Sequence, residues 1–204
     1  MYSEKPAQSY HVYGMGNAIV DIVTEVDHDF FDRHGIEKGV MTLVDEKRQL
    51  QLIKAIDMKK SRMSGGGSAG NTVVAVSQFG GRCFYSCVVA KDELGKFYLE
   101  DLKRNNIDTN LNYEDCPEGH TGKCLVMTSP DAQRTMNTFL GVSSFLGIEH
   151  LNEEALKKSE YLYMEGYLVA SQRSLEAMKE AWAVALPAKR VVPSRIQRIR
   201  INIK

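Results

Sequence analysis

The sequence predicts an α/β protein in which a mostly parallel sheet is covered by helices and interrupted by an inserted β-hairpin. Two observations predict this fold class. Strand-like apolar runs alternate with amphipathic helical runs, and the helical pattern disappears from Thr109 to Phe139 before it resumes. With 204 residues, of which 43% are hydrophobic, the chain is long enough to bury a sizeable core.

Apolar runs and capping residues predict the elements that precede the hairpin. The run His11–Val26, broken at Gly14 and Gly16, predicts two short strands or one bent strand. Helices are expected after the capping residues, from Asp27 through Phe31, from Asp45 onward, at 72–79, and after Asp92 through Asn106. Between them, strands are expected at 39–44 and 83–90.

The hairpin itself is predicted by two strand-like runs, GKCLVMTS at 122–129 and RTMNTF at 134–139, around a turn at Ser129-Pro130-Asp131. We expect the strand at 39–44 to pair with it in one small sheet that covers a site as a flap. The alternation then resumes with a helix at Asn152–Lys158, a strand at Tyr161–Val169 and a helix from Ser171 to about Ala185.

Composition excludes several classes of partner. The 26 basic and 26 acidic residues balance, so no net charge favours a specific nucleic acid, a membrane surface or an acidic partner. No run of eighteen apolar residues and no secretory signal pattern occur, so a cytoplasmic location is expected. The spacing of Cys83, Cys87, Cys116 and Cys124 suits neither a zinc site nor disulfides, which predicts reduced thiols that fill apolar space and no metal site.

Three consecutive glycines, Gly65, Gly66 and Gly67, precede the helix that holds Asn71. Glycine leaves no Cβ in the way, so main-chain N–H groups could reach an anion or a hydroxyl at the start of that helix. Neither GxxxxGK[ST] nor GxGxxG with its acidic partner is present. A tight turn packed against the sheet remains the alternative.

A second polar motif, GMGNAIVD, places Asn17 and Asp21 beyond a glycine pair at the end of the first predicted strand. Four residues apart on an extended chain, their side chains fall on one face, where an amide and a carboxylate could bind adjacent hydroxyls of a sugar. A turn-forming Asn with an ordinary surface Asp is the alternative.

Four segments together resemble one family. GMGNAIVD, SGGGSAGNT, AKDELG and TGKCLVMTSPDAQRTMNTFLG are similar to the N-terminal half of PfkB (ribokinase-like) carbohydrate kinases, nearest to adenosine kinase and related nucleoside and sugar kinases. The resemblance covers about Tyr13–Met178. It implies a doubly wound α/β/α core with a small β-sheet lid, built from segments at about 17–44 and 109–139. It also implies transfer of the ATP γ-phosphate, with Mg²⁺, to a hydroxymethyl group of a nucleoside or sugar.

The resemblance implies a set of substrate-binding residues. Asp21 would hold sugar hydroxyls with Asn17 beside it, and Asn71 would contact the same sugar. Gly66 and Gly67 would leave room for a ribose-like ring.

Two further residues come from the same resemblance, each with a plainer alternative. Arg134 would lie at the lid and phosphate side, where a guanidinium stabilises transferred charge, or would be a solvated strand arginine. Tyr167, at a strand end, would stack on a nucleobase or would be a partly buried core tyrosine. Asp92 is expected to be a helix cap.

One departure from the family concerns catalysis. The sequence contains neither the GAGD motif, which supplies the family's general base, nor the NxxE motif linked to Mg²⁺. We therefore expect residues 1–186 to form a truncated domain that lacks a catalytic residue and most of the ATP and Mg²⁺ site. The alternative is a noncatalytic nucleoside- or sugar-binding remnant.

The last eighteen residues, 187–204, are expected to be a basic tail that is not native to the fold. The segment AVALPAKRVVPSRIQRIRINIK has six basic residues, two prolines and no acidic residue, which indicates a frameshift or misjoined gene end. A nucleic-acid or membrane tail is the competing explanation. A homodimer through the lid or an exposed sheet edge is also expected.

Overall fold

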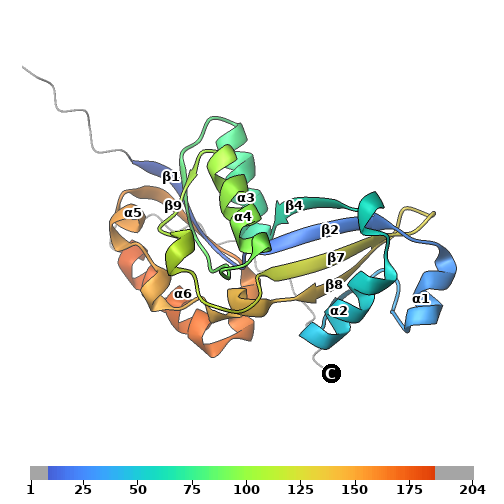
Figure 1. Cartoon of the computed structure of the whole chain (residues 1–204). Coiled ribbons are helices and arrows are strands. Elements are labelled where there is room, and N and C mark those ends of the chain that lie inside the picture. Colours follow the sequence, from blue (N-terminus) through green and yellow to red (C-terminus); the bar gives the residue numbers. More distant parts are fainter. Residues whose placement is uncertain (1–8, 187–204) are drawn as a thin grey trace, which may run out of the picture.

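A computed structural model describes residues 9–186, which form two β-sheets with helices around each (Figure 1). The first sheet has the strand order β6-β5-β1-β9, and every neighbouring pair in it is parallel. Its strands are β1 (Tyr10–Met15), β5 (Cys83–Ser86), β6 (Ile107–Asp108) and β9 (Ser159–Met164).

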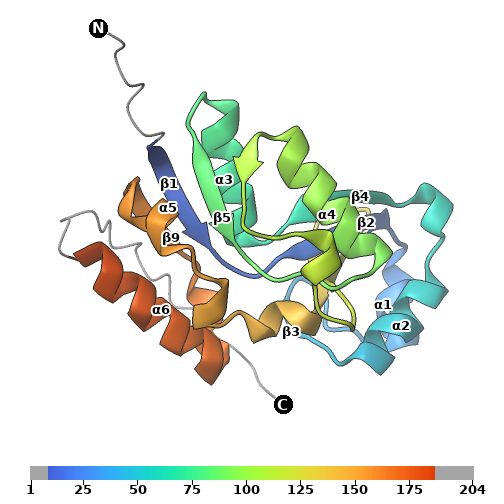
Figure 2. The same cartoon turned by 60° about the vertical axis from the view of Figure 1, so that its left-hand side comes forward.

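Helices cover both faces of this first sheet, as Figure 2 shows. They are α3 (Ser68–Gln78) and α4 (Glu93–Arg104) on one face, and α5 (Glu153–Lys157) and α6 (Gln172–Ala185) on the other. Successive residues of a strand point to opposite faces, so Phe84 packs in the core with α5 and α6, whereas Tyr85 packs with α3 and α4. The predicted doubly wound α/β/α arrangement is confirmed.

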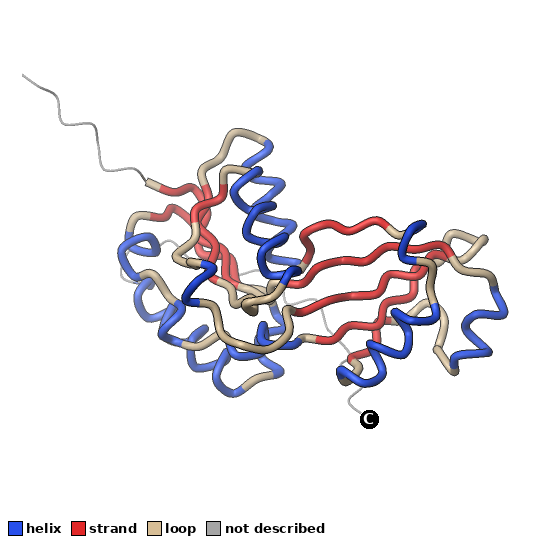
Figure 3. Tube along the Cα trace, viewed as in Figure 1, coloured by secondary structure: helices blue, strands red, loops and turns tan. Residues whose placement is uncertain are grey.

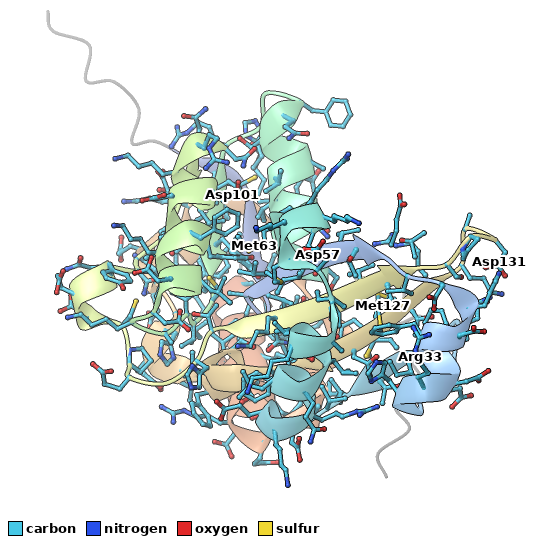
Figure 4. All side chains as sticks on the ribbon, turned by 45° about the vertical axis from the view of Figure 1, so that its right-hand side comes forward. Arg33, Asp57, Met63, Asp101, Met127 and Asp131 are labelled. Carbon is cyan, nitrogen blue, oxygen red and sulfur yellow. The ribbon has the colours of Figure 1, made fainter. Side chains whose placement is uncertain are left out.

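The second sheet lies beside the first and is mixed, with the order β3-β8-β7-β2-β4 (Figure 3). The pairs β2·β7 and β3·β8 are parallel, while β2·β4 and β7·β8 are antiparallel. Its strands are β2 (Ile19–Glu25), β3 (Met41–Leu43), β4 (Arg62–Gly66), β7 (Gly122–Thr128) and β8 (Arg134–Phe139). The hairpin and its pairing with the strand near residue 41 are therefore as expected, and Asp131 lies at the hairpin tip (Figure 4).

Only one face of the second sheet is covered by its own helices, α1 (His28–His34) and α2 (Glu46–Ala55). On that face, Ile22, Leu125 and Met127 pack against Phe30 and Leu52. The opposite face carries Asp21, Cys124 and Thr138, which are cross-strand partners in the sheet register. This second face is turned toward the first sheet and supplies one wall of the site described below.

Local sequence accounts for where most helices begin. The predicted caps Asp27, Asp45 and Asp92 each accept a hydrogen bond from the main-chain N–H three residues on, at 2.7 Å. Such a cap satisfies a donor that the first turn leaves free. Asn152 and Ser171 cap α5 and α6 in the same way.

Two apolar runs were predicted to be longer strands than the structure contains. The strand expected at 83–90 ends at Ser86, and the one expected at Tyr161–Val169 is β9, which ends at Met164. Residues 166–170 form a 3₁₀ turn that places Leu168 in the core. The run at 83–90 is buried throughout, whereas Tyr167 and Val169 of the second run are exposed. An apolar run alone does not distinguish a strand from a packed turn.

The glycine stretch also differs from expectation. Residues Arg62–Gly66 form strand β4, which the sequence did not predict, and α3 begins at Ser68 rather than Thr72. Strand β4 exists because it pairs antiparallel with β2, and its own sequence lacks the β-branched residues that favour a strand.

The four cysteines are free and buried. Cys83, Cys87 and Cys116 pack in the core beneath α3 and α4, as small apolar fillers would, and Cys124 packs in the second sheet. Within residues 9–186, none of the helices has the length and apolar character that crossing a membrane requires. The predicted basic tail lies outside the described residues.

Candidate functional site

A hollow of about 270 Å³ lies between the open face of the second sheet and the first turn of α3. Its volume is near the lower end of small-molecule sites, roughly 300 to 1,000 Å³. Six of the seven residues that the sequence analysis proposed for substrate binding line it: Asn17, Asp21, Gly67, Asn71, Arg134 and Tyr167. The seventh, Gly66, lies directly behind the Asp21 carboxylate.

The three glycines allow close approach to three different neighbours. A Cβ at Gly65 would clash with Asp101 of α4, which Figure 4 labels near strand β4. A Cβ at Gly66 would lie 2.6 Å from the carboxyl carbon of Asp21, and one at Gly67 would clash with the carbonyl oxygen of Asn17. Gly67 also has a φ of 86°, a conformation that other residues rarely adopt. Only Gly67 of the three borders the hollow.

The first turn of α3 carries Asn71 on its exposed side, with its side chain at the hollow. Its main-chain N–H donates to the carbonyl of Gly67 at 2.8 Å, as expected for an ordinary first turn. Gly67 has no side chain with which to cap the helix, and Glu165 takes that role from a distant part of the chain. The Glu165 carboxylate accepts hydrogen bonds from Ser68 Oγ at 2.8 Å and from the Ala69 N–H at 3.1 Å.

Glu165 also binds Asn17, which lies in the short connection between β1 and β2. Its other oxygen accepts from the Asn17 main-chain N–H at 2.7 Å and from the side-chain Nδ2 at 2.6 Å. Glu165 is not among the residues that the sequence analysis proposed for the site. The sequence signal that could have identified Glu165 is its place inside the apolar run YLYMEGYLV. A carboxylate buried in such a run needs hydrogen-bond donors around it.

Asp21 and Arg134 supply opposite charges to the hollow. Asp21 lies in β2 and is partly buried, and this burial raises the pKa of its carboxyl above the usual value. The positive charge of Arg134, an exposed residue of β8, opposes that shift and lowers the pKa of Asp21. The carboxylate is therefore costly to keep ionised without a partner, and hydroxyl donors or a cation would stabilise it.

Most of the remaining side chains of the second-sheet wall are apolar. Met41, Leu43, Met136 and Leu140 are among its lining residues, and Tyr167 faces the hollow from the 3₁₀ turn after β9 with 38% of its surface exposed. This placement differs from the predicted strand end, because β9 stops three residues earlier. An exposed aromatic ring beside aliphatic side chains suits a flat apolar group.

A single thiol, Cys124, also lines the hollow. Burial raises its pKa to about 11, and Thr138 Oγ1 donates a hydrogen bond to its sulfur at 3.3 Å. The thiol is therefore protonated near neutral pH and is a poor nucleophile. Among residues 9–186 there is no group of three or more histidine, cysteine or acidic side chains that could hold a metal ion.

Comparison with known proteins extends these observations. Residues 41–198 match the family described as pfkB family carbohydrate kinase. Guanosine-inosine kinase of Escherichia coli K12 is 24% identical over 187 residues, which are 90% of this chain and 43% of the kinase. Adenosine kinase 1 of Arabidopsis thaliana is 24% identical and is covered to 50% of its length. The chain thus spans about half the length of the curated relatives it matches.

Solved structures give the same result. Adenosine kinase from Sinorhizobium meliloti superimposes with a TM-score of 0.83 at 33% identity, over 90% of this chain and 55% of that protein. A probable sugar kinase protein from Rhizobium etli superimposes with a TM-score of 0.82 at 30% identity over the same shares.

Proposed function

This chain belongs to the pfkB family of carbohydrate kinases, and we propose that the hollow binds the acceptor of an ATP-dependent phosphotransferase, a nucleoside or a sugar. The fold is that of the ribokinase-like adenosine kinases. One observation carries the proposal: the hollow is lined by Asn17 with Asp21, Gly67 with Asn71, Arg134, and Tyr167, which come from four separate segments of the chain.

The polar end of the hollow suits adjacent hydroxyl groups. An ionised carboxylate accepts several hydrogen bonds, so Asp21 can accept from two hydroxyls of one ring. Asn17 and Asn71, which also line the hollow, add amide groups. Gly66 and Gly67 let the main chain approach the Asp21 carboxylate and the Asn17 main-chain carbonyl more closely than any other residue allows.

Within this function, we propose a nucleoside rather than a simple sugar. The apolar side chains of Met41, Leu43 and Met136, together with the ring of Tyr167, offer a surface that a free sugar would not use. The names of the relatives, adenosine kinase and guanosine-inosine kinase, agree with this choice.

Phosphate transfer would need ATP and Mg²⁺, which the family relation implies. Arg134 is the lining residue whose charge suits a phosphate, and it is exposed toward solvent. The 204 residues contain no GAGD sequence. We propose that this chain supplies the acceptor site and no general base, so that it binds the acceptor without phosphorylating it.

We further propose that the second sheet is the lid of a single domain. The predicted segments 17–44 and 109–139 contain four of its five strands, and β4 is the addition. Strands β3 and β4 are the outer strands of this sheet in the described chain, so a homodimer would form along one of their edges.

Calorimetric titration of the purified chain with adenosine, inosine, guanosine and ribose tests the proposal, together with a phosphotransfer assay that contains ATP and Mg²⁺. We expect binding of at least one nucleoside and no turnover. The informative variant is Asp21→Ala, and its matched control is Asp101→Ala, which removes a carboxylate near Gly65 that does not line the hollow.

Loss of binding in Asp21→Ala and its retention in Asp101→Ala would support the acceptor site. If no ligand binds, the proposed acceptor site is refuted, and the chain has kept the fold without a working site. Turnover by the 204-residue chain would refute the absence of a general base.

A further inference from the structure

We propose that Glu165 is a positioning residue that fixes the orientation of the Asn17 side-chain amide, so that Asn17 presents a hydrogen-bond acceptor to the ligand. This inference rests on the proposed function of the hollow. It concerns a carboxylate that need not touch the ligand, because hydrogen bonds within the protein already occupy both of its oxygens.

The Glu165 carboxylate connects Asn17 with the first turn of α3 through hydrogen bonds. One oxygen accepts from the main-chain and side-chain nitrogens of Asn17, at 2.7 and 2.6 Å. The other accepts from the hydroxyl of Ser68 and the N–H of Ala69, at 2.8 and 3.1 Å. Glu165 is 3% exposed and Asn17 5%, so water competes little for these bonds.

Glu165 is itself held at both ends. Its main-chain N–H donates to the carbonyl of Met15 at 3.2 Å, at the point where β1 and β9 end. Its carboxylate lies at the N-terminus of α3, where the helix dipole favours a negative charge. The side chain therefore joins three elements, and its position depends on none of them alone.

The chemistry of the two side chains determines the orientation of the amide. An ionised carboxylate can only accept hydrogen bonds, so the NH₂ group of Asn17 must face Glu165 and the amide oxygen must point elsewhere. No described residue donates a hydrogen bond to that oxygen, and Asn17 lines the hollow. Asn17 is therefore an acceptor toward the ligand, as Asp21 is, and the two together select a ligand that brings hydroxyl donors.

A double-mutant cycle tests this role through Asn17. Glu165→Gln keeps the shape but replaces one acceptor oxygen with an NH₂ group, so one pair of donors loses its partner. We expect adenosine to bind about tenfold more weakly to Glu165→Gln, the effect of losing one hydrogen bond to a buried polar group. In the Asn17→Ala background, Glu165→Gln should cause no further loss, because the group through which it acts is gone.

Nuclear magnetic resonance gives a readout that needs no ligand. In chain labelled with ¹⁵N-asparagine, the Asn17 NH₂ protons should resonate apart from those of exposed asparagines and exchange slowly, and Glu165→Gln should remove both properties. The variant Asp92→Asn is the control for effects of a general loss of stability. Asp92 also accepts three hydrogen bonds and caps α4, but it does not line the hollow. This control should leave the Asn17 resonances and adenosine affinity unchanged.

The outcomes separate the two proposals. Equal weakening by Glu165→Gln with and without Asn17 would mean that Glu165 acts on its own and would overturn the inference, as would an Asn17 resonance that Glu165→Gln leaves unchanged. If the wild-type chain binds no nucleoside, the proposed function fails, and the Asn17 resonance alone then decides whether Glu165 orients the amide.

Discussion

Gly66 and Asp21 lie so close together that a Cβ on residue 66 would be 2.6 Å from the carboxyl carbon of Asp21. The two residues belong to the neighbouring antiparallel strands β4 and β2. Because Gly66 leaves this space free, the Asp21 side chain can stay beside the main chain of β4 while it borders the hollow. A glycine that does not border the hollow thereby leaves room for a proposed ligand-binding carboxylate.

The first prediction follows from this contact. Gly66→Ala should displace the Asp21 carboxylate and weaken adenosine binding about tenfold or more, while the overpacking lowers the free energy of unfolding by about 1–3 kcal/mol. Calorimetric titration and urea denaturation measure the two effects. Ser64→Ala, an exposed change on the same strand, should alter neither, and unchanged adenosine affinity in Gly66→Ala would contradict the proposed role of the contact.

The second prediction concerns the cost of Asp21 to the folded state. Burial raises its pKa, so the folded chain holds this proton up to a higher pH than the unfolded chain does. Stability is therefore highest below the unfolded pKa and decreases as the pH rises through the folded pKa. Asp21→Asn removes that loss of stability. We therefore expect the free energy of unfolding to increase by about 0.5 kcal/mol at pH 7, and adenosine binding to be lost.

Urea denaturation of wild type and Asp21→Asn at pH 4.5 and pH 7 checks the sign. The difference in unfolding free energy between the two proteins should be larger at pH 7. A difference that instead grows toward acid pH would show that folding favours the ionised carboxylate.

The third prediction concerns Arg134. Its charge lowers the pKa of Asp21, so Arg134→Gln should raise that pKa further. If adenosine binding depends on ionised Asp21, binding should be lost as the pH is lowered, and this loss should begin at a higher pH in the variant than in the wild type. Titrations between pH 5 and pH 8 measure the shift. Arg33→Gln, at an exposed arginine of α1 that Figure 4 labels, should leave the profile unchanged.

The fourth prediction distinguishes a nucleoside from a sugar. Tyr167→Ala should weaken adenosine binding about tenfold, since stacking on an aromatic ring contributes roughly 1–3 kcal/mol per base, and should leave ribose binding unchanged. Tyr167→Phe retains the ring and should bind adenosine nearly as well as the wild type. Equal losses for adenosine and ribose would place Tyr167 beside the sugar instead of the base.

Much of the fold was predictable because its signals are local. Asp27, Asp45 and Asp92 cap their helices with side chains only three residues from the donors they satisfy. The hairpin was equally local, since two strand-like runs flank a short turn. Strand β4 could not be predicted in this way, because pairing with β2 defines it and its own residues do not.

The candidate site likewise has features that were predictable from the sequence and features that were not. The residue types of Asn17 and Asp21 and the three glycines indicated recognition of hydroxyl groups as one possibility, and the family resemblance added Asn71. That these residues lie near one another was expected only from the family resemblance. In the structure they line one hollow. The role of Gly66 beside Asp21 and the four hydrogen bonds of Glu165 could not be read from the order of residues.

The alternation of strands and helices and most of the helix starts follow from the sequence alone, because each depends on residues within a few positions of one another. Which side chains of distant segments meet depends on how the elements pack. Glu165 reaches Asn17 across 148 positions, and a contact of that separation depends on how whole elements pack, which short-range patterns do not encode.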